Sequence, residues 1–122
     1  MILADTSVWI DHFRAVNPKM RDLLAREQIA MHPIVAAELA LGSLRNRPST
    51  LLYLDLLPQA QVAQLREVRH MIEALALYAK GIGLTDVHLV ASCLLTPGTQ
   101  LWTRDAKLER VAKALGILFE QP

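Results

Sequence analysis

The sequence has one cysteine, no long apolar run and almost no net charge. Cys93 cannot form a disulfide within the chain, which fits a reducing cytoplasm. The longest apolar stretch, residues 89–95, is interrupted by Ser92 and is far shorter than the ~20 residues of a transmembrane helix. No basic region precedes an apolar stretch at the N-terminus, and an acid stands at position 5, so we expect no signal peptide. The formal net charge of +1 is too small to indicate nucleic-acid binding by itself.

The chain has 122 residues, and 52% of them are apolar. That length predicts one domain with a single ordinary core, and the apolar fraction argues against disorder. No internal repeat, linker or low-complexity stretch divides the sequence. We therefore expect residues 1–122 to form one domain.

Short apolar runs alternate with stretches of helical periodicity along the chain. The patterns predict strands at 2–4, 29–31, 101–103 and 117–119, a weaker strand centred on Val62, and helices over 8–14, from Pro18 onward, 34–45, 49–57, 66–80, 85–95 and 105–115. We expect Ser7 and Asn17 to cap the first two helices, and Thr85 or Asp86 to cap the helix that ends near residue 95. This alternation predicts an α/β fold of three layers, with helices flanking a central parallel sheet of four to five short strands.

Two acids follow predicted strands closely. Asp5 comes directly after the apolar residues 2–4, and Asp105 comes soon after residues 101–103. The carboxyl ends of parallel strands lie at one edge of a sheet, where open α/β folds bind their ligands. We therefore expect Asp5 and Asp105 to lie near each other at that edge.

Two further acids belong to predicted helices. Glu38 shares a helix face with Ile34 and Leu41, so it lies on an apolar stripe. An unpaired carboxylate is costly to bury, and Glu38 therefore needs a partner such as a cation. Asp86 stands at the amino end of a helix that is apolar on most sides, where the helix dipole favours a negative charge.

A fold that gathers these four carboxylates needs a counter-charge, because like charges raise each other's pKa. A divalent cation supplies it, and Mg²⁺ in particular takes few protein carboxylates, keeps several waters and bridges to substrate phosphate. Such a site can activate a water and neutralise the charge that develops on a phosphodiester. The hydroxyls of Thr6, Ser7 and Thr103 are candidates to orient a carboxylate or a water.

Four stretches contain these acids and follow one another in this order: ADTSVWID (residues 4–11), VAAELALG (35–42), LTDVHLVASCLL (84–95) and LWTRDAKLERVAKALGI (101–117). They resemble the successive motifs of PIN-domain ribonucleases, and most of all those of the VapC toxins of bacterial toxin–antitoxin pairs. The resemblance covers nearly the whole chain.

The resemblance implies an endoribonuclease that depends on Mg²⁺ or Mn²⁺. It also implies a homodimer and silencing by a cognate antitoxin that covers the site. Matched position by position, Asp5, Glu38, Asp86 and Asp105 are the family's acidic metal ligands, and Thr103 is its Thr or Ser near the site. Many members have a small residue after the third acid, where this chain has Val87-His88. That difference leaves the ligands unchanged but can alter how RNA or a partner approaches.

Other interpretations of the acids remain open. The structural alternatives are a turn at Asp5, a helix cap at Asp86 or at Asp105, and an ion pair of Glu38 with Arg45 or Lys107. For the whole chain, one alternative is a Mg²⁺-binding receiver domain of phosphate signalling. Receivers have adjacent acids after their first strand, whereas Ala4 precedes Asp5 here. Another alternative is a PIN-like module that only binds RNA or a partner, although all four acids are present.

The remaining polar residues give weaker signals. The four histidines, His12, His32, His70 and His88, show no metal-ligand spacing and are expected at the surface or its boundary. Cys93 is expected in the core, and Trp9 and Trp102 in the core or a dimer contact. The residues that can hold RNA phosphates, or simply face solvent, are Arg14, Arg45, Arg47, Arg104 and Lys107. The helices over 49–57 and around 8–13 are the candidate dimer surface.

Overall fold

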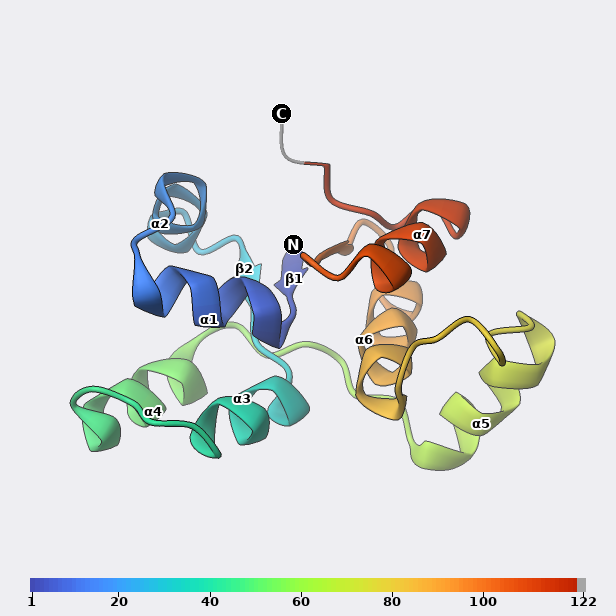
Figure 1. The fold of residues 1–122 in the computed structure, drawn as a ribbon, viewed down its shortest axis with the longest axis horizontal. Coiled ribbons are helices and arrows are strands. Elements are labelled where there is room, and N and C mark those ends of the chain that lie inside the picture. The colour runs from blue at the N-terminus through green and yellow to red at the C-terminus, as the bar shows by residue number, and fades with distance from the viewer. Residues whose placement is uncertain (121–122) are drawn as a thin grey trace.

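The computed structural model describes residues 1–120, in which three short strands lie among seven helices (Figure 1). In chain order they are β1 (Ile2–Ala4), α1 (Thr6–Arg14), α2 (Pro18–Ala25), β2 (Ile29–Ala30), α3 (Pro33–Ala40), α4 (Arg47–Leu56), α5 (Leu65–Ala74), α6 (Leu84–Leu95), β3 (Gln100–Trp102) and α7 (Ala106–Ala114). Within residues 1–120, none of the helices has the length and apolarity that crossing a bilayer requires.

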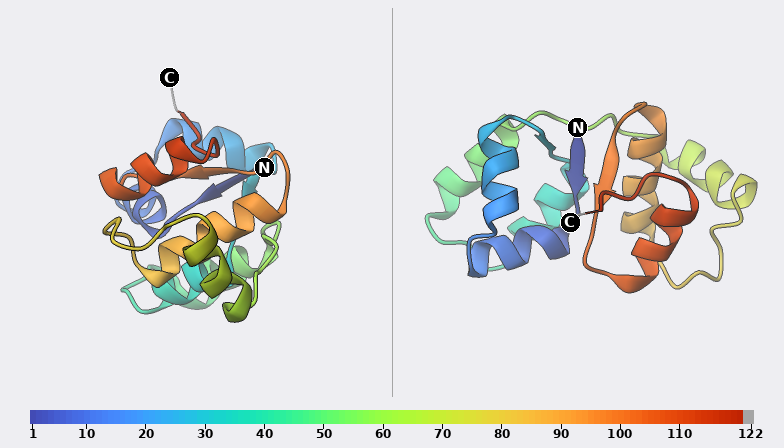
Figure 2. Two further views of the ribbon diagram at one scale, coloured as in Figure 1. Left: turned by 90° about the vertical axis from the view of Figure 1, so that its right-hand side faces the viewer. Right: turned by 90° about the horizontal axis from the view of Figure 1, so that it is seen from above.

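The sheet has the strand order β2-β1-β3, and both pairings are parallel. Leu3 of the central strand lies opposite Ala30 of β2 and Leu101 of β3. Figure 2 shows helices on both faces of this sheet, with α2 and α7 on one side and α3 and α6 on the other. The predicted α/β fold with three layers is therefore confirmed.

The sheet of residues 1–120 has three strands, and the prediction of four to five was wrong in this detail. Residues 117–119 make only an isolated parallel bridge, between Leu118 and Leu101. The weak strand expected around Val62 is absent from the described residues, and the chain instead forms one bridge earlier, between Gln59 and Met31. Both segments extend the sheet edge by a single pairing, which is too short to count as a strand.

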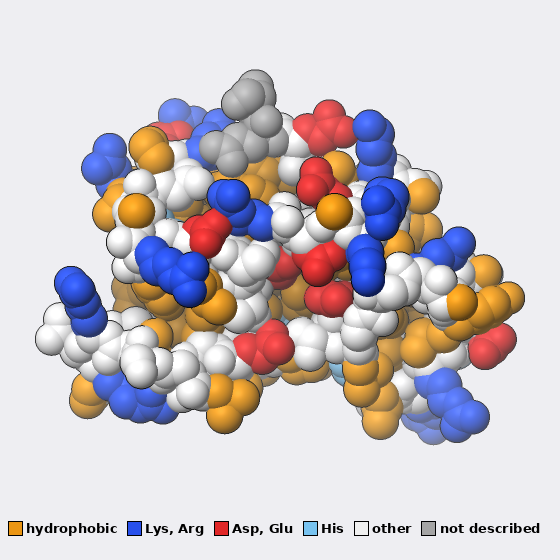
Figure 3. Space-filling view, viewed as in Figure 1, with side chains coloured by type: hydrophobic (Ala, Val, Ile, Leu, Met, Phe, Trp, Pro, Cys, Tyr) orange, Lys and Arg blue, Asp and Glu red, His pale blue; other side chains and the backbone are white. Residues whose placement is uncertain are grey.

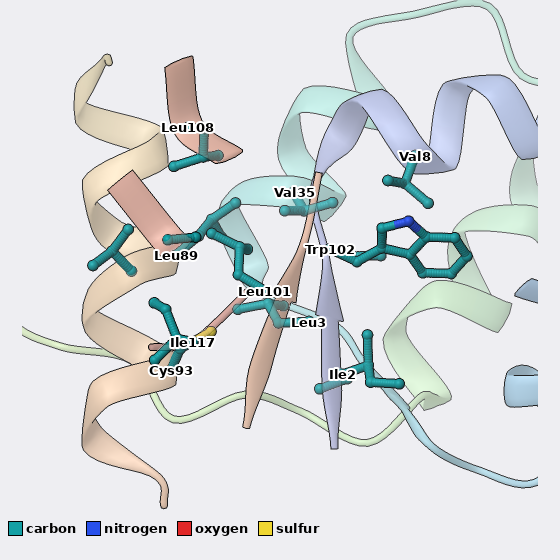
Figure 4. Packing of buried hydrophobic residues seen from close by; sticks show 14 of the residues in the cluster. Ile2, Leu3, Val8, Val35, Leu89, Cys93, Leu101, Trp102, Leu108 and Ile117 are labelled. Carbon is teal, nitrogen blue, oxygen red and sulfur yellow. The ribbon is translucent and has the colours of Figure 1, made fainter. Parts of the chain in front are cut away.

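The core lies around β1 and is closed by apolar side chains from both helix layers (Figure 4). Leu3, Leu101 and Leu108 are fully buried, and every residue from 87 to 93 of α6 is buried. The prediction that this helix is central is thus confirmed. Trp9 and Trp102 are also buried, as is Cys93, which places all three in the core.

Several predicted helix boundaries were wrong. The helix expected over 34–45 ends at Ala40, and the one expected over 66–80 ends at Ala74. Beyond Ala74 the chain turns repeatedly through left-handed backbone conformations, at Ala76, Ala79 and Gly81. The apolar periodicity of residues 75–80 therefore belongs to a loop that packs on the core, through the buried Leu77.

Two predicted caps were also wrong. Asp5, and not Ser7, caps α1, because the Asp5 carboxylate accepts the Val8 N–H and the helix begins at Thr6. Gly83, and not Thr85 or Asp86, precedes α6, so that Asp86 lies within the first turn. Asn17 caps α2 as predicted.

Candidate active site

The pairing of β1 with β3 brings the first acid to a threonine from the far end of the chain. The Asp5 N–H donates to the Trp102 carbonyl at 2.9 Å, which continues the ladder to the carboxyl end of both strands. The Thr103 hydroxyl donates to Asp5 Oδ2 and accepts the Asp105 N–H at 3.0 Å. Thr103 therefore joins two of the predicted site acids directly.

Asp5 is the most enclosed of the four acids, with 5% of its surface exposed. Its Oδ1 accepts the Ser7 hydroxyl at 2.5 Å and the Val8 N–H at 3.1 Å, in addition to the Thr103 bond at Oδ2. Ser7 in turn accepts the Arg104 N–H at 3.1 Å. Three donors thus hold the Asp5 carboxylate in one orientation, and burial without such donors would be costly.

Glu38 is brought to the same edge because α3 packs against α1. The Thr6 hydroxyl donates to Glu38 Oε1 at 2.6 Å, and the glutamate is half-buried. The expected alternative, an ion pair with Arg45 or Lys107, is not formed: within residues 1–120 the ion pairs join Arg26 to Asp22 and Arg104 to Asp11. That second pair, 2.7 Å long, lies at the rim of the site and was not foreseen from the sequence.

Asp86 is electrostatically coupled to the other three acids. Its Oδ2 accepts the Gly83 N–H at 3.1 Å at the start of α6. Burial raises the pKa of Asp86 above its usual value, the Gly83 hydrogen bond opposes this, and the negative charges of Asp105, Asp5 and Glu38 raise the pKa further. The fold therefore brings all four predicted acids into one electrostatic neighbourhood.

Asp105 is exposed and caps α7, with Oδ1 accepting the N–H groups of Lys107 and Leu108 at 2.8 and 3.0 Å. The cap interpretation of this residue is thus correct, but it occupies only one carboxylate oxygen. Among residues 1–120, Asp105 Oδ2, Asp86 Oδ1 and Glu38 Oε2 accept no hydrogen bond. A cap and a ligand can therefore be the same side chain, through different oxygens.

The surface above these residues has a distinct charge pattern. Figure 3 shows acidic side chains gathered along the middle of the face between α1 and α7, with Lys and Arg on either side. In the part of the chain that the structure describes, no three Asp, Glu, His or Cys side chains lie close enough together to enclose one ion directly. The acids form an open cluster of oxygen donors.

A buried histidine lies behind this cluster, between the helices of Glu38 and Asp86. His32 caps α3 and is fully buried, so its expected place at the surface was wrong. Its Nδ1 accepts the Ile34 N–H at 3.0 Å, which puts the proton of the neutral ring on Nε2. Nε2 is buried and has no hydrogen-bond partner within residues 1–120, and since Nε2 carries the proton, His32 offers no lone pair to a metal. Its ring contacts that of His88 edge-on, 6.3 Å between centroids.

Two comparisons with known proteins agree. Residues 2–114 match the model of the family described as PIN domain. The chain is also 39% identical over 121 residues to Ribonuclease VapC32 from two strains of Mycobacterium tuberculosis, CDC 1551 / Oshkosh and ATCC 25618 / H37Rv. Each alignment covers 99% of this chain and 98% of the relative.

Proposed function

Because the chain belongs to the PIN domain family, we propose that it is a Mg²⁺- or Mn²⁺-dependent endoribonuclease, with residues 1–122 acting as one nuclease domain. The observation that supports this most directly is that Thr103 joins Asp5 to Asp105 by hydrogen bonds, with Glu38 held beside them by Thr6 and the pKa of Asp86 raised by burial and then by the other three charges. The relative is named a ribonuclease and aligns with this chain over nearly its whole length, which supports RNA as the substrate.

The chemistry of the donor set fits a hard divalent cation. The four candidate ligands offer only carboxylate oxygens, and no Lys or Arg of residues 1–120 forms an ion pair with any of them. Burial and, after it, the repulsion of the other three acids raise the pKa of Asp86, and a positive ion would relieve that repulsion. Mg²⁺ takes few protein carboxylates and keeps several of its waters.

Each residue has a distinct role in this proposal. Asp5 is the fixed ligand, since Thr103, Ser7 and the Val8 N–H hold both of its oxygens in place. Asp86, Glu38 and Asp105 each present one oxygen that accepts no hydrogen bond within residues 1–120. Thr103 positions Asp5 and the Asp105 backbone together. The bound ion would lower the pKa of a water and neutralise charge on the phosphodiester.

We further propose that the protein is the toxin of a cytoplasmic toxin–antitoxin pair, silenced by a cognate antitoxin. The basis is the resemblance of its motifs to VapC toxins together with the similarity to Ribonuclease VapC32. A homodimer belongs to the same proposal. Leu52 and Leu56 on α4, with 58% and 75% of their surfaces exposed, and Phe13 on α1 give that predicted dimer surface apolar side chains to bury.

The decisive experiment is cleavage of total RNA by the purified protein with Mg²⁺, with Mn²⁺ and with EDTA. We expect cleavage that requires the metal and is abolished by Asp5→Asn. The matched control is Asp22→Asn, which changes an exposed aspartate on α2 and should cleave like the wild type. Circular dichroism and thermal unfolding establish that Asp5→Asn is folded.

A folded Asp5→Asn protein that cut RNA at the wild-type rate would refute the proposed site. If wild-type protein binds Mn²⁺ and RNA but cleaves nothing, the domain is the binding-only module that the sequence left as an alternative.

A further inference from the structure

A hollow of about 350 Å³ lies between α7 and the loop that precedes α6. Its walls are apolar and include Leu75, Leu77 and Leu115, and its charged residues are Lys80, Lys107 and Arg110. We call it the basic hollow. No acidic side chain lines it. Lys107 and Arg110 are three residues apart on α7 and therefore share a face of that helix.

These three cations have no ion-pair partner within residues 1–120, where the ion pairs involve only Arg26 and Arg104. Three unneutralised positive charges around one hollow repel one another, and an anion placed there relieves the repulsion. Although the net charge of the chain is only +1, its charges are separated locally, with acids at the sheet edge and cations over α7 beside them (Figure 3).

The backbone accommodates Lys107 at a specific point. Gly81 has a φ of +78°, and a Cβ on it would lie 2.7 Å from Lys107 Cδ. The lysine side chain therefore runs directly over the Gly81 backbone, and any other residue there would displace it. This contact places the stem of Lys107 against the loop that precedes α6.

The basic hollow begins at the end of α7 that Asp105 caps, and its other wall is the loop that leads to Asp86. Lys107 is two residues after Asp105 on the same helix start, and its side chain lies over Gly81. Gly81 is two residues before Gly83, whose N–H binds Asp86. An RNA strand that approaches four carboxylates is repelled by them, and cations at their border offset that repulsion.

We propose that the basic hollow binds the backbone phosphates of the RNA on one side of the bond to be cut. Lys80, Lys107 and Arg110 contact phosphate oxygens, and the leucine walls lie against a sugar or base. This rests on the proposed ribonuclease function and extends it, by assigning a path for the strand. Phosphate contacts are independent of sequence, so the hollow sets affinity and register and not base preference.

The test is equilibrium binding of a fluorescein-labelled, mixed-sequence single-stranded RNA 20-mer, in EDTA so that the RNA is not cut, over a range of salt. The variant is the double change Lys107→Gln/Arg110→Gln. Its matched control is Lys19→Gln/Arg21→Gln on α2, which removes the same charge beside the opposite edge strand. Thermal unfolding of both shows that they are folded.

The expected effect follows from counterion release. Each phosphate contact to a single strand contributes about −0.7 to the slope of log K against log salt. Two lost contacts reduce the magnitude of the slope by about 1.4. At 0.1 M salt this corresponds to about 25-fold weaker binding than the wild type, and the difference in affinity vanishes on extrapolation to 1 M salt. The control should keep the wild-type slope. In a cleavage assay, the double variant should raise the KM.

An unchanged slope in the folded double variant would overturn the proposal, as would wild-type protein that binds this RNA without salt dependence. Binding of poly-glutamate at the hollow, with RNA binding unaffected, would assign it to an acidic protein partner and would also overturn the proposal. The ribonuclease function is judged separately, by metal-dependent cleavage with wild-type protein. If the wild type cleaves RNA but the double variant keeps the wild-type salt slope, only the proposed phosphate contacts of the basic hollow are refuted.

Discussion

The hydroxyl of Thr103 is the best single point at which to perturb the site without changing its charge. Thr103 is 6% exposed and its hydroxyl serves two of the acids: it donates to the Asp5 carboxylate and accepts the Asp105 N–H. Thr103→Val removes both hydrogen bonds and nearly preserves the volume. The change therefore isolates the contribution of this one oxygen atom.

The magnitude follows from what is left unpaired. A hydrogen bond to a charged group contributes about 1.5–3 kcal/mol, and Asp5 is buried, so water cannot fully replace the lost donor. The Asp105 N–H is only partly buried, and its loss adds less. We expect Thr103→Val to lower the free energy of unfolding by about 2–4 kcal/mol, and to lower the rate of RNA cleavage by releasing Asp5 from its fixed orientation.

The assay is urea unfolding of Thr103→Val beside Thr99→Val, a control at another buried threonine, whose hydroxyl forms no hydrogen bond within residues 1–120. A double-mutant cycle with Asp5→Asn measures the coupling, which should exceed about 1 kcal/mol because the residues are in contact. If Thr103→Val were as stable as Thr99→Val and showed no coupling to Asp5→Asn, the assigned role of the hydroxyl would be wrong.

Three further predictions concern buried ionisable groups. The raised pKa of Asp86 means that its ionisation at neutral pH opposes folding, so Asp86→Asn should raise the Tm in EDTA, while Mg²⁺ should stabilise the wild type more than this variant. Burial, and then the charge of His88, lower the pKa of His32 below its usual 6.5. The unfolded state therefore binds more protons at acidic pH, and the free energy of unfolding that is present above pH 6.5 should fall as the pH drops through the pKa of folded His32. Between pH 7.5 and pH 5.5, urea unfolding should show a smaller loss of this free energy for His32→Gln than for the wild type. Burial raises the pKa of Cys93 to about 12, so a thiol reagent at pH 8 should react only after denaturation, and rapid reaction with native protein would contradict its burial.

The residues of the candidate site could be proposed from the sequence because each is tied to a local signal. Asp5 follows an apolar run directly, and Asp105 stands between a strand and a helix, so each marks the carboxyl end of a strand. Glu38 was identified because a carboxylate on an apolar helix face needs a partner. The motif order then connected these separate signals to one family, which the comparisons confirm.

The errors have local physical causes. The helix predicted over 66–80 has the right apolar period, but the backbone reverses at Ala76 and Ala79, and the period alone cannot reveal a left-handed residue. The sequence favoured Ser7 as the first cap, but Asp and Ser side chains both cap helices, and the local sequence does not choose between Asp5 and Ser7. The Thr103 hydrogen bond, from the neighbouring strand, helps to hold Asp5 in that place.

The sequence by itself predicted where most strands and helices lie, the buried character of β1 and α6, and the four candidate ligands, because these predictions depend on neighbours a few residues away. Only the tertiary structure decided which atoms meet. The contact between Thr103 and Asp5, the pair of Arg104 with Asp11 and the position of Lys107 over Gly81 all join residues distant in the chain. Such contacts depend on strand register and helix packing, which arise from the whole core and not from any one segment.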